Sequence, residues 1–108
     1  MLTSGFLSVG TATLKVIASG VIAADKSYHL VGGEGATTDD LTTITGGTEG
    51  DILILRNDGG QTITYKHGAA ANNMALTGGA DYVSTSSADT LMLLFAGSLW
   101  LEVGRGDI

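Results

Sequence analysis

The sequence predicts an all-β protein, an antiparallel β-sandwich or jelly-roll-like barrel assembled as a trimer, and three observations support this fold class. The 108-residue chain contains 17 glycines and no proline, which suits short strands joined by tight turns. Segments rich in β-branched and aromatic residues recur between glycine-rich or polar stretches. Two segments, 52–55 and 91–95, are apolar at every position, as in strands covered on both faces. We expect neighbouring copies of the chain to supply part of that cover.

The expected strands fill most of the chain and follow one another at short intervals. They are 13–17, 21–23, 27–31, 41–45, 52–56, 61–66, 74–76, 82–83, 90–95 and 99–103. Residues 37–40 (Thr-Thr-Asp-Asp) are compatible with a short capped helical turn before the strand at 41–45. The stretch Asn-Asp-Gly-Gly at 57–60 predicts a tight hairpin turn between the strands on either side of it. A second hairpin, made of the last two strands, is expected to close the domain.

The domain organisation follows from this pattern. We expect one β domain over 11–104, an extended N-terminal arm over 1–10 and a flexible C-terminal tail over 105–108. The arm carries apolar residues that have no partner in the strand pattern, and such arms fray unless they are docked. Binding to a partner surface is therefore predicted for Leu2, Phe6, Leu7 and Val9.

Alternation along the strands divides their side chains between two faces. The predicted core consists of Ile52, Ile54, Ile63, Leu91, Leu93, Phe95 and Leu101. The residues of opposite parity are assigned to a second layer or a subunit interface, and they are Leu53, Leu55, Met92 and Leu94. The single tryptophan, Trp100, is expected to be a half-buried anchor on an edge strand. The alternative is an aromatic platform for a glycan or a partner subunit.

Charge and motif content exclude several classes of function. The formal net charge is −6, with five Lys and Arg residues spread along the chain, whereas phosphate backbones are bound by clustered basic residues. No segment is apolar over the length of a membrane span. The chain has no cysteine, and His29 and His67 lie in no metal-binding pattern. We therefore expect a non-enzymatic protein without cofactor or metal that binds neither nucleic acid nor membrane, with both histidines at a surface or interface.

Residues 12–105 resemble a module found in bacteriophage virion proteins, notably tail fibres, spikes and head fibre or decoration proteins. In that module a DDLxTIxGGxxG segment precedes a buried strand and a hairpin, and xLxGGxD and GxxWxEvxR segments follow. Here the matching segments are DDLTTITGGTEGD (39–51), ILIL (52–55), MALTGGAD (74–81), DTLML (89–93) and GSLWLEVGR (97–105). The family has no defined catalytic motif, so the resemblance implies no catalytic residue.

The resemblance implies a structural role in the virion. We expect a capsid decoration or cement protein that is made in the host cytoplasm and lies on the capsid surface. Its expected partners are two further copies of itself, in a homotrimer, and the major capsid protein. The alternative is a tail-fibre or spike tip module that binds glycans of the host surface.

Overall fold

The computed structural model describes residues 8–35 and 37–108, and it confirms the predicted all-β class. Besides a short 3-10 turn, η1 (Thr77–Gly79), none of the described residues forms a helix, and none therefore forms one that could cross a membrane. The strands are β1 (Thr13–Val16), β2 (Val21–Ala23), β3 (Tyr28–Gly32), β4 (Thr38–Leu41), β5 (Thr43–Thr45), β6 (Ile52–Asn57), β7 (Thr62–Tyr65), β8 (Met74–Ala75), β9 (Tyr82–Ser84), β10 (Thr90–Ala96) and β11 (Leu99–Gly106).

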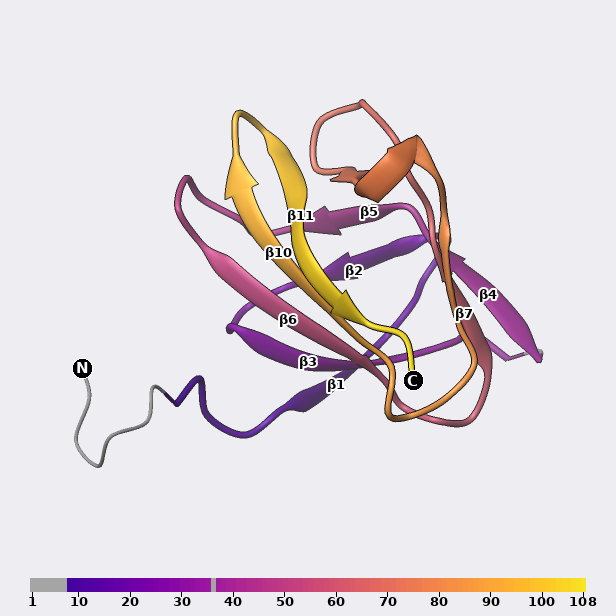
Figure 1. Ribbon diagram of the computed structural model, residues 1–108. Helices are drawn as coiled ribbons and strands as arrows, with labels where there is room; N and C mark the ends of the chain where they lie inside the picture. Colours follow the sequence, from indigo (N-terminus) through magenta and orange to yellow (C-terminus); the bar gives the residue numbers. More distant parts are fainter. Residues whose placement is uncertain (1–7, 36) are drawn as a thin grey trace.

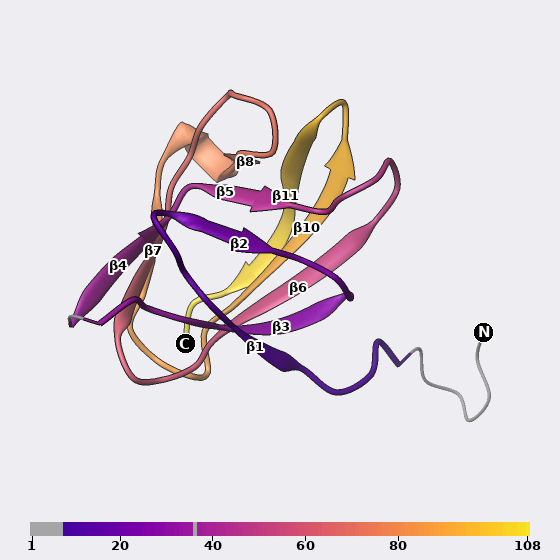
Figure 2. The same ribbon diagram turned by 180° about the vertical axis from the view of Figure 1, so that it is seen from behind.

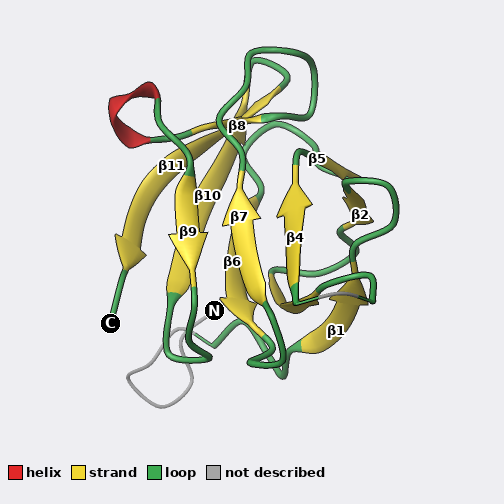
Figure 3. Ribbon diagram, turned by 90° about the vertical axis from the view of Figure 1, so that its right-hand side faces the viewer, coloured by secondary structure: helices red, strands yellow, loops and turns green. Residues whose placement is uncertain are grey.

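These strands form three sheets arranged in two layers. The largest sheet has six strands in the order β1-β3-β6-β10-β11-β8. A three-stranded sheet (β4-β7-β9) and a two-stranded sheet (β2-β5) lie together on one side of it (Figures 2 and 3). The other side of the six-stranded sheet has no layer over it among the described residues and faces the viewer in Figure 1. The predicted sandwich is thus present, with one sheet covered on a single face.

The strand directions correct the antiparallel prediction. From β3 to β7 the chain visits the three sheets in turn, so each strand lies beside the strand one circuit earlier and runs in the same direction. Thr38 pairs with Thr62 and Val21 with Thr43 in this way. Five of the eight strand pairs in the described part of the chain are parallel, which also excludes the all-antiparallel jelly roll. The arrangement is a short solenoid-like coil whose last circuit is closed by β10 and β11.

Only one of the two predicted hairpins is present. β10 and β11 form the closing antiparallel hairpin as predicted. The hairpin prediction at 57–60 is wrong, because β6 and β7 belong to different sheets. The buried amide of Asn57 is the reason: its Nδ2 donates to Gln61 O and to Ser84 O, each at 3.0 Å. Gly59 N donates to Asn57 Oδ1 at 2.7 Å, and the turn thus carries the chain from one sheet to the other.

The core lies between the two layers and corrects the predicted parity of two strands. Ile63, Leu91, Leu93 and Phe95 are buried as predicted. The prediction is wrong for Ile52, Ile54 and Leu101, which lie on the uncovered side of the six-stranded sheet. Their places in the core are taken by Leu53, Leu55 and Trp100, so Leu53 and Leu55 are not available to a subunit interface. In a run of consecutive apolar residues, the sequence gives no local signal for which alternate residues face the core.

Two further local predictions need correction. Residues 38–41 form strand β4, because each of them pairs with β7 in parallel, and this pairing overrides the capping propensity of Thr and Asp. Strand β11 continues to Gly106, and Ile108 N donates to Asp89 Oδ1 at 2.8 Å, so residues 105–108 do not form the predicted free tail.

Candidate functional site

The uncovered side of the six-stranded sheet is the most unusual surface of the described chain, and we call it the outer face. Its centre is built by two cross-strand pairs between β6 and β10, Ile54 with Met92 and Ile52 with Leu94. Residues directly opposite each other on neighbouring strands point to the same side, and Leu101 on β11 extends the row beside Leu94. Ile52, Met92 and Leu101 are 37–38% exposed. The centre of the outer face is therefore apolar and open to solvent.

The outer face continues to the first edge of the sheet. Tyr28 on β3 lies beside Ile54, and Leu30 lies beside Leu14 on β1. Leu14 and Val16 have exposed fractions of 48% and 54%. Five adjacent strands thus present aliphatic and aromatic side chains to solvent. An apolar patch of this extent on a soluble protein usually marks an interaction site.

Charged side chains are nearly absent from the outer face. Among the outward positions of β1, β3, β6, β10 and β11, the charged residue is Arg56, which lies beside Thr90. Its Nη1 donates to Ser87 O at 3.3 Å, so the guanidinium is directed toward the turn that precedes β10. The chain as a whole carries a formal charge of −6. The acidic groups of the described residues therefore lie elsewhere, and the outer face carries little charge that would repel another surface.

A hollow of about 350 Å³ interrupts the outer face at its far edge, between β10 and β11. It lies where the register of these strands shifts after Met92, so that Met92 is opposite Gly104. Ile54, Thr90 and Met92 contribute side chains, and Gly104 and Gly106 contribute open backbone. The hollow is therefore lined mainly by apolar atoms.

Arg105 and Glu102 form a fixed pair beside the hollow. The Arg105 guanidinium donates to both Glu102 carboxylate oxygens, at 2.7 and 2.8 Å, and lies 4.1 Å above the ring of Tyr82. Hydrogen bonding to Arg105 lowers the pKa of Glu102 to about 2. The Arg105 side chain is thus held in place by Glu102 and Tyr82.

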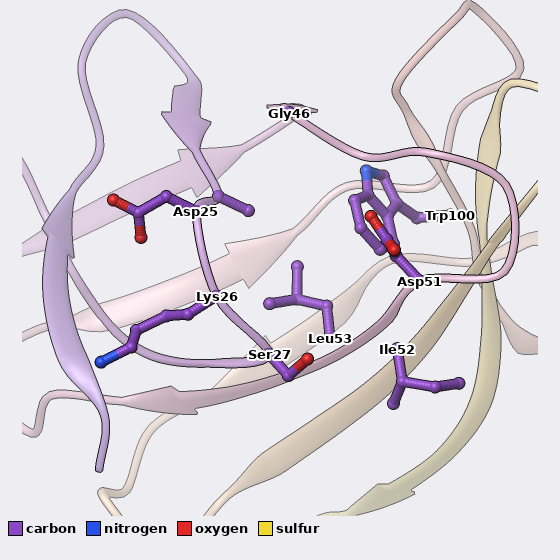
Figure 4. Close-up of a pocket in the computed structure, with 9 residues that line it drawn as sticks. Asp25, Lys26, Ser27, Gly46, Asp51, Ile52, Leu53 and Trp100 are labelled. Carbon is purple, nitrogen blue, oxygen red and sulfur yellow. The ribbon is translucent and has the colours of Figure 1, made fainter. Parts of the chain in front are cut away.

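A second, more polar pocket of about 250 Å³ lies between the turn after β2 and the segment before β6 (Figure 4). Its charged side chains are engaged with the chain itself. Lys15 Nζ donates to Asp25 at 3.2 Å and holds the pKa of that carboxyl below its usual value. Asp51 accepts from Thr48 N at 2.9 Å. In Figure 4, Asp25 and Lys26 point away from Trp100, and these contacts brace the two loops.

His29 is part of the same bracing and is buried, which corrects its expected place at a surface. Its Nδ1 lies 3.1 Å from Thr13 O, and Asp25 N donates to its Nε2 at 3.2 Å. One arrangement, with the ring proton on Nδ1, satisfies both contacts. His29 therefore joins β1 to the turn after β2. Among the described residues, no group of three or more His, Cys, Asp or Glu side chains gathers at one point.

Trp100 is a core residue on a strand that lies between β10 and β8. The expected half-buried position on an edge strand is therefore wrong, and so is the alternative of a glycan or partner platform. The Trp100 side chain packs edge-on against Phe95, with ring centroids 4.9 Å apart, and the residue is only 2% exposed. The indole Nε1 donates to Ile44 O at 3.0 Å. Gly47 passes so close that a Cβ there would lie 2.5 Å from the indole ring. The buried indole ring therefore joins β11 to β5 and is not available to a ligand.

The other predicted site residues fall into two groups. Met92 and Leu94 do lie on the outer face, and their role in a subunit interface stays a prediction. Leu2, Phe6 and Leu7 lie outside the described residues, and Val9 is partly exposed. The outward position of Ile52, Ile54 and Leu101 was not predicted from the sequence. The bulk of Trp100 was an available signal, because an inward Trp100 places Leu101 outward by simple alternation.

The fold and the outer face define a class: a small all-β domain whose largest sheet presents an apolar face to solvent. Comparison with known families gives the specific assignment. Residues 18–101 match the family model of the phage depolymerase C-terminal beta sandwich domain, and the chain belongs to this family. The predicted resemblance to a bacteriophage virion structural module is thereby confirmed, and of the types named in that prediction the match supports the tail fibre. No curated protein and no solved structure matches the chain.

Proposed function

We propose that this domain is a non-catalytic assembly module of a phage tail fibre or spike, and that its outer face packs against further copies of the same chain. The observation that carries the proposal is the apolar, nearly uncharged surface over five strands. Strands that are apolar on both faces normally have both faces covered. Fully burying one large aliphatic side chain contributes about 1.5–3 kcal/mol, so covering several of them on each copy gives a stable contact.

A homotrimer is the assembly that we propose for these copies. Cyclic association covers the outer face of every copy equally and ends at a closed particle. It also covers the edges of the sheet, which otherwise invite uncontrolled strand pairing. The name of the family, which refers to depolymerases, favours a place in the tail over the capsid surface expected from the sequence.

The proposed self-association through the outer face is tested by substituting Met92, which is exposed at the centre of that face. Met92→Asp places a charge where the proposed contact excludes water, and an unpaired buried charge is strongly unfavourable. We expect the protein to sediment as an oligomer and Met92→Asp to sediment as a monomer in analytical ultracentrifugation at micromolar concentration.

The matched control is Val83→Asp. Val83 is 50% exposed on β9, in the three-stranded sheet on the opposite side of the molecule, and its substitution should leave the oligomer intact. A monomeric parent protein, or an oligomer that survives Met92→Asp, contradicts the proposal. Binding of the parent protein to purified capsids, lost on deletion of residues 1–10, would instead support the decoration role. Binding on a glycan array would support the alternative of a glycan-binding tip.

A further inference from the structure

The hollow at the far edge of the outer face is open above Gly104, which lies at the register shift between β10 and β11. A Cβ built on Gly104 meets no atom within 4 Å, and its φ is not positive. Within a strand, glycine is less favourable than alanine by about 0.5–1 kcal/mol. A strand glycine often marks a bulge, as it does here, or a place where another molecule approaches the backbone closely. The bulge at Gly104 leaves an open space in the outer face that a side chain of another molecule can enter.

The opposite edge of the same face carries projecting side chains. β1 is the edge strand there, and Leu14 and Val16 point outward beside Leu30 and Gly32 of β3. Both are about half exposed, and the described residues provide no further strand beyond them. The outer face therefore has aliphatic projections at one edge and an aliphatic hollow at the other.

We propose that Leu14 and Val16 of one copy occupy the hollow over Gly104 of the neighbouring copy. This inference rests on the proposed function and specifies which parts of the outer face meet. Most of the exposed lining of the hollow is apolar, and its one charged lining residue, Arg105, is already paired with Glu102. The hollow therefore fits a branched aliphatic side chain better than a sugar or a phosphate. A contact that joins two different patches of identical chains repeats from copy to copy, and it closes when the rotation between copies is cyclic.

Filling the hollow tests this contact without disturbing the fold. Gly104→Val adds a side chain where the chain itself leaves open space, and it excludes the projecting residues of the neighbour. We expect the association constant from sedimentation equilibrium to fall by at least about tenfold, which corresponds to ~1.4 kcal/mol. Leu14→Ala should weaken association as well, and the two substitutions together should cost less than the sum of their separate effects because they remove the same contact.

Gly60→Val is the matched control. Gly60 also has no atom within 4 Å of a built Cβ and no positive φ, but it lies in the turn between β6 and β7. Its substitution should leave association unchanged. Unchanged or stronger association of Gly104→Val overturns the inference.

Cross-linking identifies the contacting edges directly, because the chain contains no natural cysteine. Two single variants are made, Val16→Cys and Met92→Cys. A short bismaleimide is added to each variant expressed alone and to the two variants expressed together. A covalent dimer that forms in the co-expressed sample and in neither single sample supports the inference. Cross-linking of Val16→Cys alone, or an oligomer without any cross-link, overturns the inference but leaves the proposed function standing. A monomeric parent protein overturns both.

Discussion

Replacing Trp100 by alanine is expected to destabilise the domain by about 3–5 kcal/mol, the range measured for removal of large buried aromatic side chains. The ring is almost fully buried and packs against Phe95. Its removal leaves a cavity between β11 and β5, and Ile44 O loses the indole donor at 3.0 Å. Small domains are stable by only about 5–15 kcal/mol, so Trp100→Ala removes a large part of the total.

Urea denaturation at a fixed protein concentration checks this expectation. Circular dichroism is the appropriate signal, because Trp100 is the single tryptophan and its fluorescence is lost with the substitution. Trp100→Phe keeps most of the ring volume but loses the N–H group, and it should cost an intermediate amount. Val83→Ala, at an exposed position, serves as the control. A cost for Trp100→Ala no larger than that of the control would show that the ring does not anchor the core.

Most strands could be predicted from the sequence because their signals are local. The alternation of Ile63 and Tyr65 with polar residues, and the turn around Gly97, are read within a few residues, and both are present in the structure. The partners of these strands could not be predicted in the same way. β3 pairs with β6, and β4 pairs with β7, after a full circuit of the chain through the three sheets. No local sequence pattern shows which strands will be paired in this way.

The candidate site was predicted only in part, for a related reason. In β10 the inward assignment of Leu91 and Leu93 was correct, and it places Met92 and Leu94 on the outer face. In β6 the four apolar residues at 52–55 are alike in size and polarity, so the sequence does not show which two of them face the core. The structure resolves it through Asn57, whose inward amide fixes the turn. Leu53 and Leu55 then share its face, and Ile52 and Ile54 lie outward.

Removal of the Asp89 carboxylate is expected to have the second large effect, because this buried group joins two distant parts of the chain. Asp89 is 2% exposed. Its Oδ2 accepts from Thr85 N at 3.0 Å and from Ser86 N and Ser84 Oγ at 3.2 Å. Its Oδ1 accepts from Ile108 N at 2.8 Å. The carboxylate thus closes the turn between β9 and β10 and fastens the end of the chain to it.

The same contacts make the stability of the domain depend on pH. Burial alone would raise the pKa of Asp89, but the hydrogen bonds from Ile108, Thr85, Ser86 and the Ser84 hydroxyl together hold it below its ordinary value of 3.8. A carboxyl whose pKa is lower in the folded state binds its proton more readily when unfolded. Its contribution is therefore complete at pH values above the unfolded pKa. It decreases as the pH falls below that value and is lost once the pH passes the folded pKa.

Asp89→Asn tests both expectations. The amide keeps one acceptor oxygen but directs donors toward the N–H groups that the carboxylate bound, and each buried donor left without a partner costs about 1–3 kcal/mol. At neutral pH we expect lower stability in urea denaturation than for the parent protein. Between about pH 5 and pH 3, on either side of the usual aspartate pKa, stability should fall less steeply for the variant, because the group that titrates is gone. Asp58→Asn, at an exposed position, is the control and should keep the parent's pH dependence. If Asp89→Asn keeps it too, the acid sensitivity of this domain originates at another carboxylate, and Asp89 acts through its shape alone.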